Sequence, residues 1–168
     1  MLTEKIIIPE RKEIILFDTT LRDGHQCPWA AVESDNQYFD IVRWLDSIWI
    51  NICEVWFPAS SQHEAWRVSE VAKMARDGEI SMMVCGLSQM VDFQVEACLK
   101  SLEPAAEKNK AFFHIYFPVD PNLRQASIWS KVSDTQAVEK IAKFAKLATD
   151  IWMISQFSPE WYSRVWEN

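Results

Sequence analysis

Apolar residues along this chain fall into short continuous runs that alternate with longer segments in which they recur at helical spacing. The short runs predict strands. These are Glu13–Phe17, Asn51–Phe57, Ile80–Leu87, Ala111–Phe117 and Ile151–Phe157. The longer segments predict helices, two of which have a serine at the start. These are Ser34–Leu45, Gln62–Arg76, a helix near Gln89–Leu102, and Asp134–Thr149.

This alternating order of strands and helices predicts the α/β class. The strands are too apolar to be half exposed, so we expect a parallel sheet covered by helices. The pattern alone leaves open whether the sheet is an open doubly wound one or a closed barrel. No GxGxxG or GxxxxGK motif follows the first strand, which weakens a nucleotide-binding interpretation. At 168 residues the chain has the size of one domain.

Composition argues against two classes of partner and indicates the cellular compartment. The net charge of −7 argues against a nucleic-acid partner. No apolar run approaches the roughly 20 residues that cross a bilayer, so we expect no membrane partner, and the N-terminal segment does not read as a signal peptide. Cys27, Cys53, Cys85 and Cys98 lie far apart without CxxC spacing. We therefore expect reduced thiols in a cytoplasmic protein.

Polar residues gather where the predicted strands end, which is where parallel α/β folds place their chemistry. A carboxylate next to a guanidinium can bind a divalent ion and stabilise an oxyanion. Two residues of the fourth strand alternate and must point to the same face. The candidates are Arg22 and Asp23 after the first strand, Glu54 on the second, His114 and Tyr116 on the fourth, and Ser158 and Glu160 at the end of the fifth.

Each candidate has a structural interpretation as well. An isolated Arg22–Asp23 pair is more often an ion pair in a loop. His114 and Tyr116 would, alone, be ordinary core residues, and Glu160 could lie at a helix start. Independent structural roles do not explain why such groups converge at the same end of four strands.

The segment Phe17–Pro28, FDTTLRDGHQCP, resembles the signature of the DRE-TIM metallolyases. That superfamily holds the 2-isopropylmalate, citramalate and homocitrate synthases and the biotin-dependent carboxyltransferases. The segments Glu54–Ser60, His114–Leu123 and Phe157–Asn168 look more like the 2-isopropylmalate synthase family than the carboxylases. The family fold is a (β/α)8 TIM barrel. The resemblance therefore implies that residues 1–168 are about five βα units of a partial catalytic barrel domain, truncated at the C-terminus.

The resemblance also implies a reaction and its cofactors. The family carries out a Claisen-type condensation of acetyl-CoA with 3-methyl-2-oxobutanoate in leucine biosynthesis, followed by thioester hydrolysis. By motif, Asp23 would be a ligand of a divalent metal (Mg, Mn or Zn), and Arg22 would stabilise the enolate or alkoxide oxygen. His114 and Tyr116 would line the keto-acid pocket, and Glu160 would assist proton transfer.

By the same resemblance, Glu54 and Ser158 would support the substrate site. The HxH metal ligands of the family lie on a later strand that this sequence does not reach. Because one aspartate is fewer than the roughly three protein ligands of a catalytic metal, we expect this chain alone to be inactive. Family members are commonly homodimers at full length.

Alternatives remain open at this point. Within enzymes, they are a citramalate or homocitrate synthase or a carboxyltransferase domain. In another class, the chain would be a non-catalytic half-barrel that pairs with a partner. The fifth predicted strand contains neither charge nor proline, which disfavours a chain evolved to expose that edge.

The chain has 9 Trp and only 3 Gly, whereas glycine usage averages about 7%. Gly78 occupies one helix-to-strand turn, but Trp49 and Trp152 occupy the equivalent position in two others. The resemblance adds further tryptophans at glycine positions of the family. These are Trp29, Trp56, Trp129, Trp161 and Trp166. One hypothesis is that UGA codons have been written as Trp where the source organism reads Gly. The alternative is genuine tryptophans in a destabilised barrel.

Overall fold

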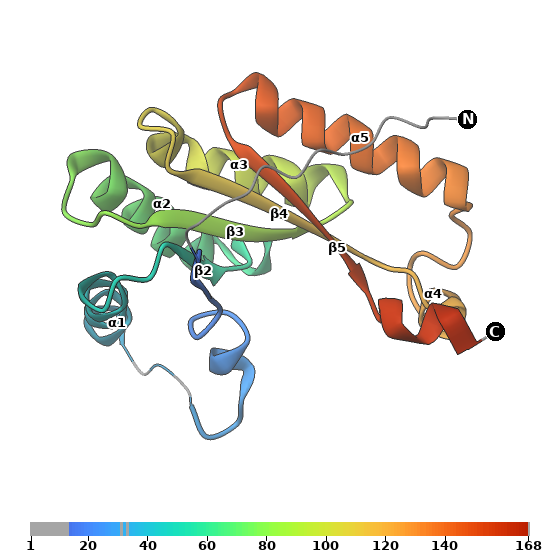
Figure 1. The fold of residues 1–168 in the computed structure, drawn as a ribbon, viewed down its shortest axis with the longest axis horizontal. Coiled ribbons are helices and arrows are strands. Elements are labelled where there is room, and N and C mark those ends of the chain that lie inside the picture. The colour runs from blue at the N-terminus through green and yellow to red at the C-terminus, as the bar shows by residue number, and fades with distance from the viewer. Residues whose placement is uncertain (1–13, 31, 33, 168) are drawn as a thin grey trace.

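The computed structural model describes residues 14–167 except 31 and 33, and it contains a single five-stranded parallel sheet (Figure 1). Each of the first four strands is followed by a segment that returns to the start of the next. The strands are β1 (Phe17–Asp18), β2 (Ile52–Trp56), β3 (Met83–Gln89), β4 (Ala111–Pro118) and β5 (Ile154–Glu160). The predicted α/β class and its parallel sheet are therefore confirmed.

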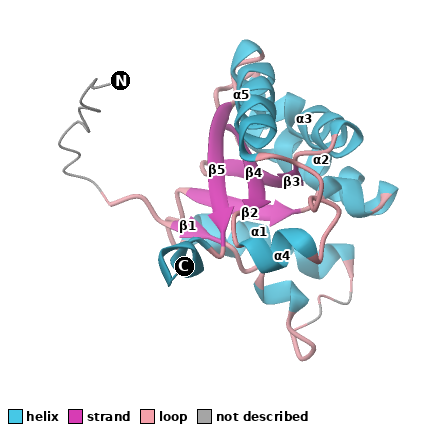
Figure 2. Ribbon diagram, turned by 90° about the vertical axis from the view of Figure 1, so that its right-hand side faces the viewer, coloured by secondary structure: helices cyan, strands magenta, loops and turns pink. Residues whose placement is uncertain are grey.

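The strand order decides between the two architectures that the sequence left open. The order is β1-β2-β3-β4-β5, with every neighbouring pair parallel. A doubly wound sheet reverses its order at a switch point, whereas a barrel adds each strand on the same side of the last. Right-handed crossovers in one direction put the helices on one face, as Figure 2 shows for α2, α3 and α5. The sheet is half of a TIM barrel.

The crossover helices begin where the sequence places capping serines. Ser34, Ser61 and Ser133 each accept a hydrogen bond from the amide three residues later, and the last forms a capping box with Gln136. The helices are α1 (Asp35–Ser47), α2 (Gln62–Asp77), α3 (Asp92–Ala106), α4 (Pro121–Gln125) and α5 (Asp134–Asp150). Three short 3-10 segments complete the described elements. They are η1 (Gly24–Gln26), η2 (Pro58–Ser60) and η3 (Tyr162–Glu167).

The hydrophobic core lies between the sheet and these helices. Val55, Val84 and Phe113 of the strands are 0% exposed. At Gly86 a Cβ atom would lie 2.8 Å from the Cys98 sulfur, so the absent side chain lets α3 approach β3 closely. The core therefore fixes the strands whose ends carry the polar candidates.

The first, third and last strands differ from the sequence prediction. β1 begins at Phe17 and not at Glu13, which lies outside the described residues; Ile14 precedes the strand and is 86% exposed. β3 begins at Met83, three residues later than predicted. β5 begins at Ile154, three residues later than predicted, since α5 continues to Asp150 and a turn follows. Among the described residues, no helix is both long enough and apolar enough for a bilayer.

Candidate functional site

A cavity of about 420 Å³ lies at the carboxyl ends of the strands. Most of the predicted site residues line it. The lining residues are Arg22, Asp23, Gln26, Leu87, His114, Tyr116, Ser158 and Glu160. The convergence predicted from the strand ends is thus present in the structure, whereas the roles of these residues stay predictions.

The loop after β1 holds Arg22 and Asp23 at this cavity. The amides of Arg22, Asp23 and Gly24 all donate to the Thr19 carbonyl, at 3.1, 2.7 and 3.2 Å. Leu21, directly before Arg22, is 1% exposed and anchors the loop in the core. The Arg22 and Asp23 side chains form an ion pair at 2.9 Å, and the Asp23 carboxylate is 67% exposed. The loop therefore presents a cation and an accessible carboxylate together.

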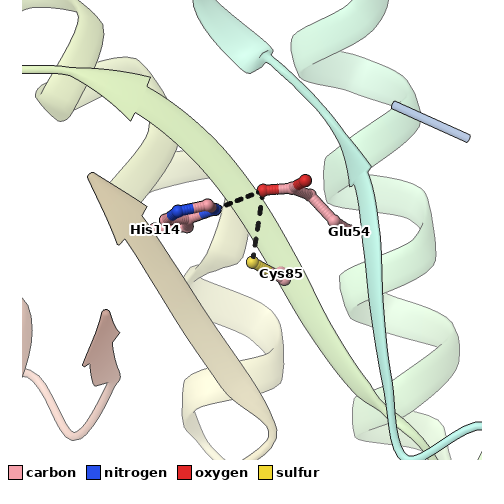
Figure 3. Close-up of side chains that lie close together, drawn as sticks. All are labelled: Glu54, Cys85 and His114. Atoms are coloured by element: carbon pink, nitrogen blue, oxygen red, sulfur yellow. Dashed lines mark hydrogen bonds and ion pairs between the residues drawn. The ribbon is translucent and has the colours of Figure 1, made fainter. Parts of the chain in front are cut away.

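Glu54 lies behind this pair, fully buried on β2. Its Oε2 accepts a hydrogen bond from Arg22 Nε at 2.6 Å. Its Oε1 accepts one from His114 Nδ1 at 2.5 Å, which Figure 3 draws as a dashed line. Burial by itself raises the pKa of the Glu54 carboxyl, but hydrogen bonds and charge from His114 and Arg22 outweigh burial. The net pKa lies below the usual value, so Glu54 is a carboxylate that connects β1, β2 and β4.

A carboxylate can only accept, so His114 Nδ1 donates to Glu54. The other ring nitrogen, Nε2, forms a hydrogen bond with the Ser158 hydroxyl, 2.7 Å away on β5, as acceptor when the imidazole is neutral and as donor when it is charged. The chain Glu54–His114–Ser158 therefore orients both the imidazole and the hydroxyl. The site thus combines an oriented hydroxyl with a guanidinium.

Tyr116 lies beside Ser158 in the register of β4 and β5. Burial raises the pKa of its phenol; a hydrogen bond with Gln89 offsets part of this, and the negative charge of Glu160 adds to the increase. Tyr116 is therefore a neutral hydroxyl at physiological pH, suited to donate a hydrogen bond to an anionic ligand.

Glu54, Cys85 and His114 offer ligand atoms that all lie within 4.8 Å of one another, a group that can hold a metal ion (Figure 3). Two facts weigh against a metal there. Without a metal, burial and nearby Glu54 raise the pKa of the Cys85 thiol well above its usual value, so a metal would have to displace the thiol proton. Both Glu54 oxygens already accept hydrogen bonds. The cluster is better explained as a hydrogen-bonded support.

Asp23 fits a hard divalent ion in chemistry and exposure, but a single carboxylate does not complete a site of about three protein ligands. Among the described residues no second carboxylate lies with it in a complete ligand set. The predicted metal role of Asp23 therefore depends on ligands that this part of the chain does not supply.

The sequence analysis expects Glu54 to support the substrate site. The structure places Glu54 outside the cavity lining, where it contacts Arg22 and His114 from behind. The sequence analysis did not single out Gln26 and Leu87, which line the cavity. Leu87 is near the end of β3, so the strand-end rule applied to every strand would have found it.

A second cavity, of about 470 Å³, lies between α3 and α5 on the outer face of the barrel. Its lining includes Leu99, Phe144 and Leu147 with scattered charged residues. We assign the site to the smaller cavity, because titratable groups from the ends of β1, β4 and β5 converge there and not between the helices.

Comparison with known proteins gives the family context. The HMGL-like family profile matches residues 13–167. Two similar relatives are named 2-isopropylmalate synthase. The protein of Hydrogenovibrio crunogenus is 30% identical over 150 residues, covering 89% of this chain and 27% of the relative. That of Rhodopseudomonas palustris (strain TIE-1) is 30% identical over 112 residues, covering 67% of this chain and 20% of the relative. The chain thus spans about a quarter or less of these relatives.

Proposed function

This chain belongs to the HMGL-like family, and we propose that its cavity binds a 2-oxo acid for a Claisen-type condensation with acetyl-CoA, as in 2-isopropylmalate synthase. The observation that carries the proposal is the convergence of a guanidinium, an oriented imidazole–hydroxyl pair and two carboxylates around one cavity. A 2-oxo acid has a carboxylate and a ketone, which such donors recognise.

The formal charge of the site supports a bound cation. Arg22 provides one positive charge, whereas Asp23, Glu160 and the adjoining Glu54 provide three negative charges. The net charge of the site is −2 with a neutral His114 and −1 with a charged one, and either would repel a 2-oxo acid anion. We propose that Asp23 holds a divalent ion with ligands from outside the described residues. When bound, that ion would polarise the ketone.

The residues of this chain have distinct proposed roles. Arg22 stabilises the developing oxyanion, because its guanidinium reaches the cavity while Glu54 fixes its orientation. His114, Tyr116 and Ser158 bind the 2-oxo acid through hydrogen bonds. Glu160 moves the proton during condensation. Glu54 acts through Arg22 and His114 and is a positioning residue.

Several parts of the proposal concern the whole protein. Acetyl-CoA as co-substrate, a place in leucine biosynthesis, a cytoplasmic setting and a homodimer follow from the resemblance to 2-isopropylmalate synthases. We further propose that additional strands continue the sheet beyond β5, where Ile154 and Phe157 are 48% and 37% exposed. Such strands would cover this apolar edge and bring the missing metal ligands.

A second candidate function follows from the Glu54–His114–Ser158 chain, because an acid, a histidine and a serine at hydrogen-bonding distances also form hydrolytic triads. In that case Ser158 would be a nucleophile and would react covalently with a fluorophosphonate probe. We expect no label at Ser158, since its role here is to bind substrate. Stoichiometric labelling that is lost in His114→Ala would favour the hydrolase.

The synthase proposal is tested by the release of CoA from acetyl-CoA with the full gene product and added Mg²⁺ or Mn²⁺. Offering pyruvate, 3-methyl-2-oxobutanoate and 2-oxoglutarate separately distinguishes the related synthases. Glu160→Gln should lower kcat roughly 10²–10⁴-fold, the range for loss of an acid–base group. The exposed Glu139→Gln on α5 is the matched control and should keep full activity. Equal activity of both variants would contradict the role of Glu160, and no CoA release with any 2-oxo acid would refute the proposed reaction.

A further inference from the structure

Four helix-to-strand turns of the half-barrel share one backbone geometry. In each, one residue has a positive φ: Trp49 at 73°, Gly78 at 80°, Asn109 at 56° and Trp152 at 65°. In each, the next amide donates to the carbonyl five residues earlier. These bonds are Ile50 to Leu45 at 3.3 Å, Glu79 to Met74 at 2.9 Å, Lys110 to Ala105 at 2.9 Å, and Met153 to Ala148 at 3.0 Å.

This bond defines a Schellman motif, whose penultimate residue must be left-handed. Glycine is the usual residue there because it has no Cβ, and asparagine is the common substitute. Two of the four turns therefore contain the expected residues, Gly78 and Asn109. The other two contain tryptophan, and a residue with so bulky a side chain is a conformational outlier in the left-handed region.

No packing at the helix-to-strand turns compensates for this backbone. Trp49 and Trp152 are 83% and 78% exposed, although tryptophan is highly buried on average. Trp161, directly after the cavity residue Glu160, also has a positive φ of 63° and is 44% exposed. Its indole contacts the Arg164 guanidinium, 3.7 Å from the ring centroid, at the surface, where such contacts stabilise little.

We propose that positions 49, 152 and 161 are glycine in the protein made by its source organism, because their UGA codons are read there as glycine. The positive-φ residues other than glycine among the described residues are these three tryptophans and Asn109. Writing tryptophan in place of glycine raises the number of Trp and lowers the number of Gly, and this chain, with 9 Trp and 3 Gly, departs from ordinary composition in that way.

The structure separates these three positions from the other tryptophans. Trp129 is 5% exposed and its ring lies against Phe117, so an indole is accommodated there. Trp29 and Trp56 have no positive φ, and the side chain of Trp166 lies outside the described part. The proposal therefore rests on the backbone of positions 49, 152 and 161 alone.

Peptide mass spectrometry of the natural protein, isolated from its source organism, tests the proposal directly. Trypsin releases Leu147–Arg164, which contains both Trp152 and Trp161, and Trp44–Arg67, which contains Trp49. Fragment spectra should show glycine at the three positions, with UGA in the gene. Tryptophan in these spectra, or UGG codons at these positions, would overturn the proposal.

A second measurement uses the chain with tryptophan at these positions. Trp49→Gly and Trp152→Gly should each raise the folding equilibrium constant roughly five-fold, since the left-handed region costs a non-glycine residue of this kind about that factor. Trp44→Gly and Trp66→Gly are matched controls inside α1 and α2, and they should lower it, because glycine weakens a helix interior. If all four variants lowered stability alike, the two turns would not be glycine positions.

Discussion

Replacing Glu54 with glutamine tests whether this buried carboxylate holds the site together. The two nitrogen partners of Glu54 are donors: Arg22 Nε–H at 2.6 Å and His114 Nδ1–H at 2.5 Å. A glutamine amide has one acceptor oxygen, and its NH2 group would face the second donor. Glu54→Gln therefore leaves one donor without an acceptor inside the protein.

The expected cost follows from that lost bond. A hydrogen bond to a charged group contributes about 1.5–3 kcal/mol. The Arg22 side chain is 21% exposed and regains some contact with water, whereas Glu54 is fully buried. We expect Glu54→Gln to lower the free energy of unfolding by about 2 kcal/mol. Glu54→Ala should cost about 3–5 kcal/mol, because it leaves a buried charge unpaired.

Urea denaturation at neutral pH, followed by circular dichroism, measures both values. Glu79→Gln is the matched control, since Glu79 pairs with Arg43 at 2.7 Å at the surface, where both side chains are about half exposed. Such a pair contributes about 1 kcal/mol or less. If Glu54→Gln destabilised the protein no more than Glu79→Gln, the assignment of Glu54 as a buried support would be refuted.

The stability difference between the wild type and Glu54→Gln should depend on pH. The pKa of Glu54 in the folded protein lies below the ordinary 4.5. A lowered pKa means that the folded state favours the carboxylate, so this stability is fully present above about pH 4.5 and is lost as the pH falls through the folded-state value. The difference between the wild type and Glu54→Gln should be constant at neutral pH and shrink below about 4.5. A difference that grew on acidification would have the wrong sign.

Three further predictions concern the scaffold. Ser133→Ala removes the capping box of α5 and should lower stability by about 1 kcal/mol in a thermal melt, whereas the exposed Ser130→Ala should change it by less than about 0.5 kcal/mol. Gly86→Ala places a Cβ atom 2.8 Å from the Cys98 sulfur and should lower the free energy of unfolding by about 1–3 kcal/mol. Adding Cys98→Ala should restore part of that loss. Additive costs of the two substitutions would exclude the contact as the cause. Exposed Cys27 should react with a thiol reagent in the folded protein, while the other three cysteines should react only on unfolding, because they are buried. Labelling of all four cysteines at one rate would contradict the fold.

The sequence by itself determined the elements and the ends at which the chemistry lies. Apolar runs and capping serines are local signals, so α2 and α5 were located to within a residue at each end. The strand-end rule predicts that Arg22, His114 and Glu160 lie together, and all three line one cavity. The unusual tryptophans at positions 49 and 152 were also visible, because helix-to-strand turns have a local glycine requirement.

Only the tertiary structure decided the order of the strands and the partners of the buried groups. A half-barrel and a doubly wound sheet share the same local pattern, and they differ only in which strands pair. The position of Glu54 behind the cavity likewise depends on contacts with residues 32 and 60 positions away in the sequence. Such contacts form when separate elements pack together, and no local spacing specifies them. The sequence therefore predicted which residues meet, and the packing decided which of them face the ligand and which hold the others in place.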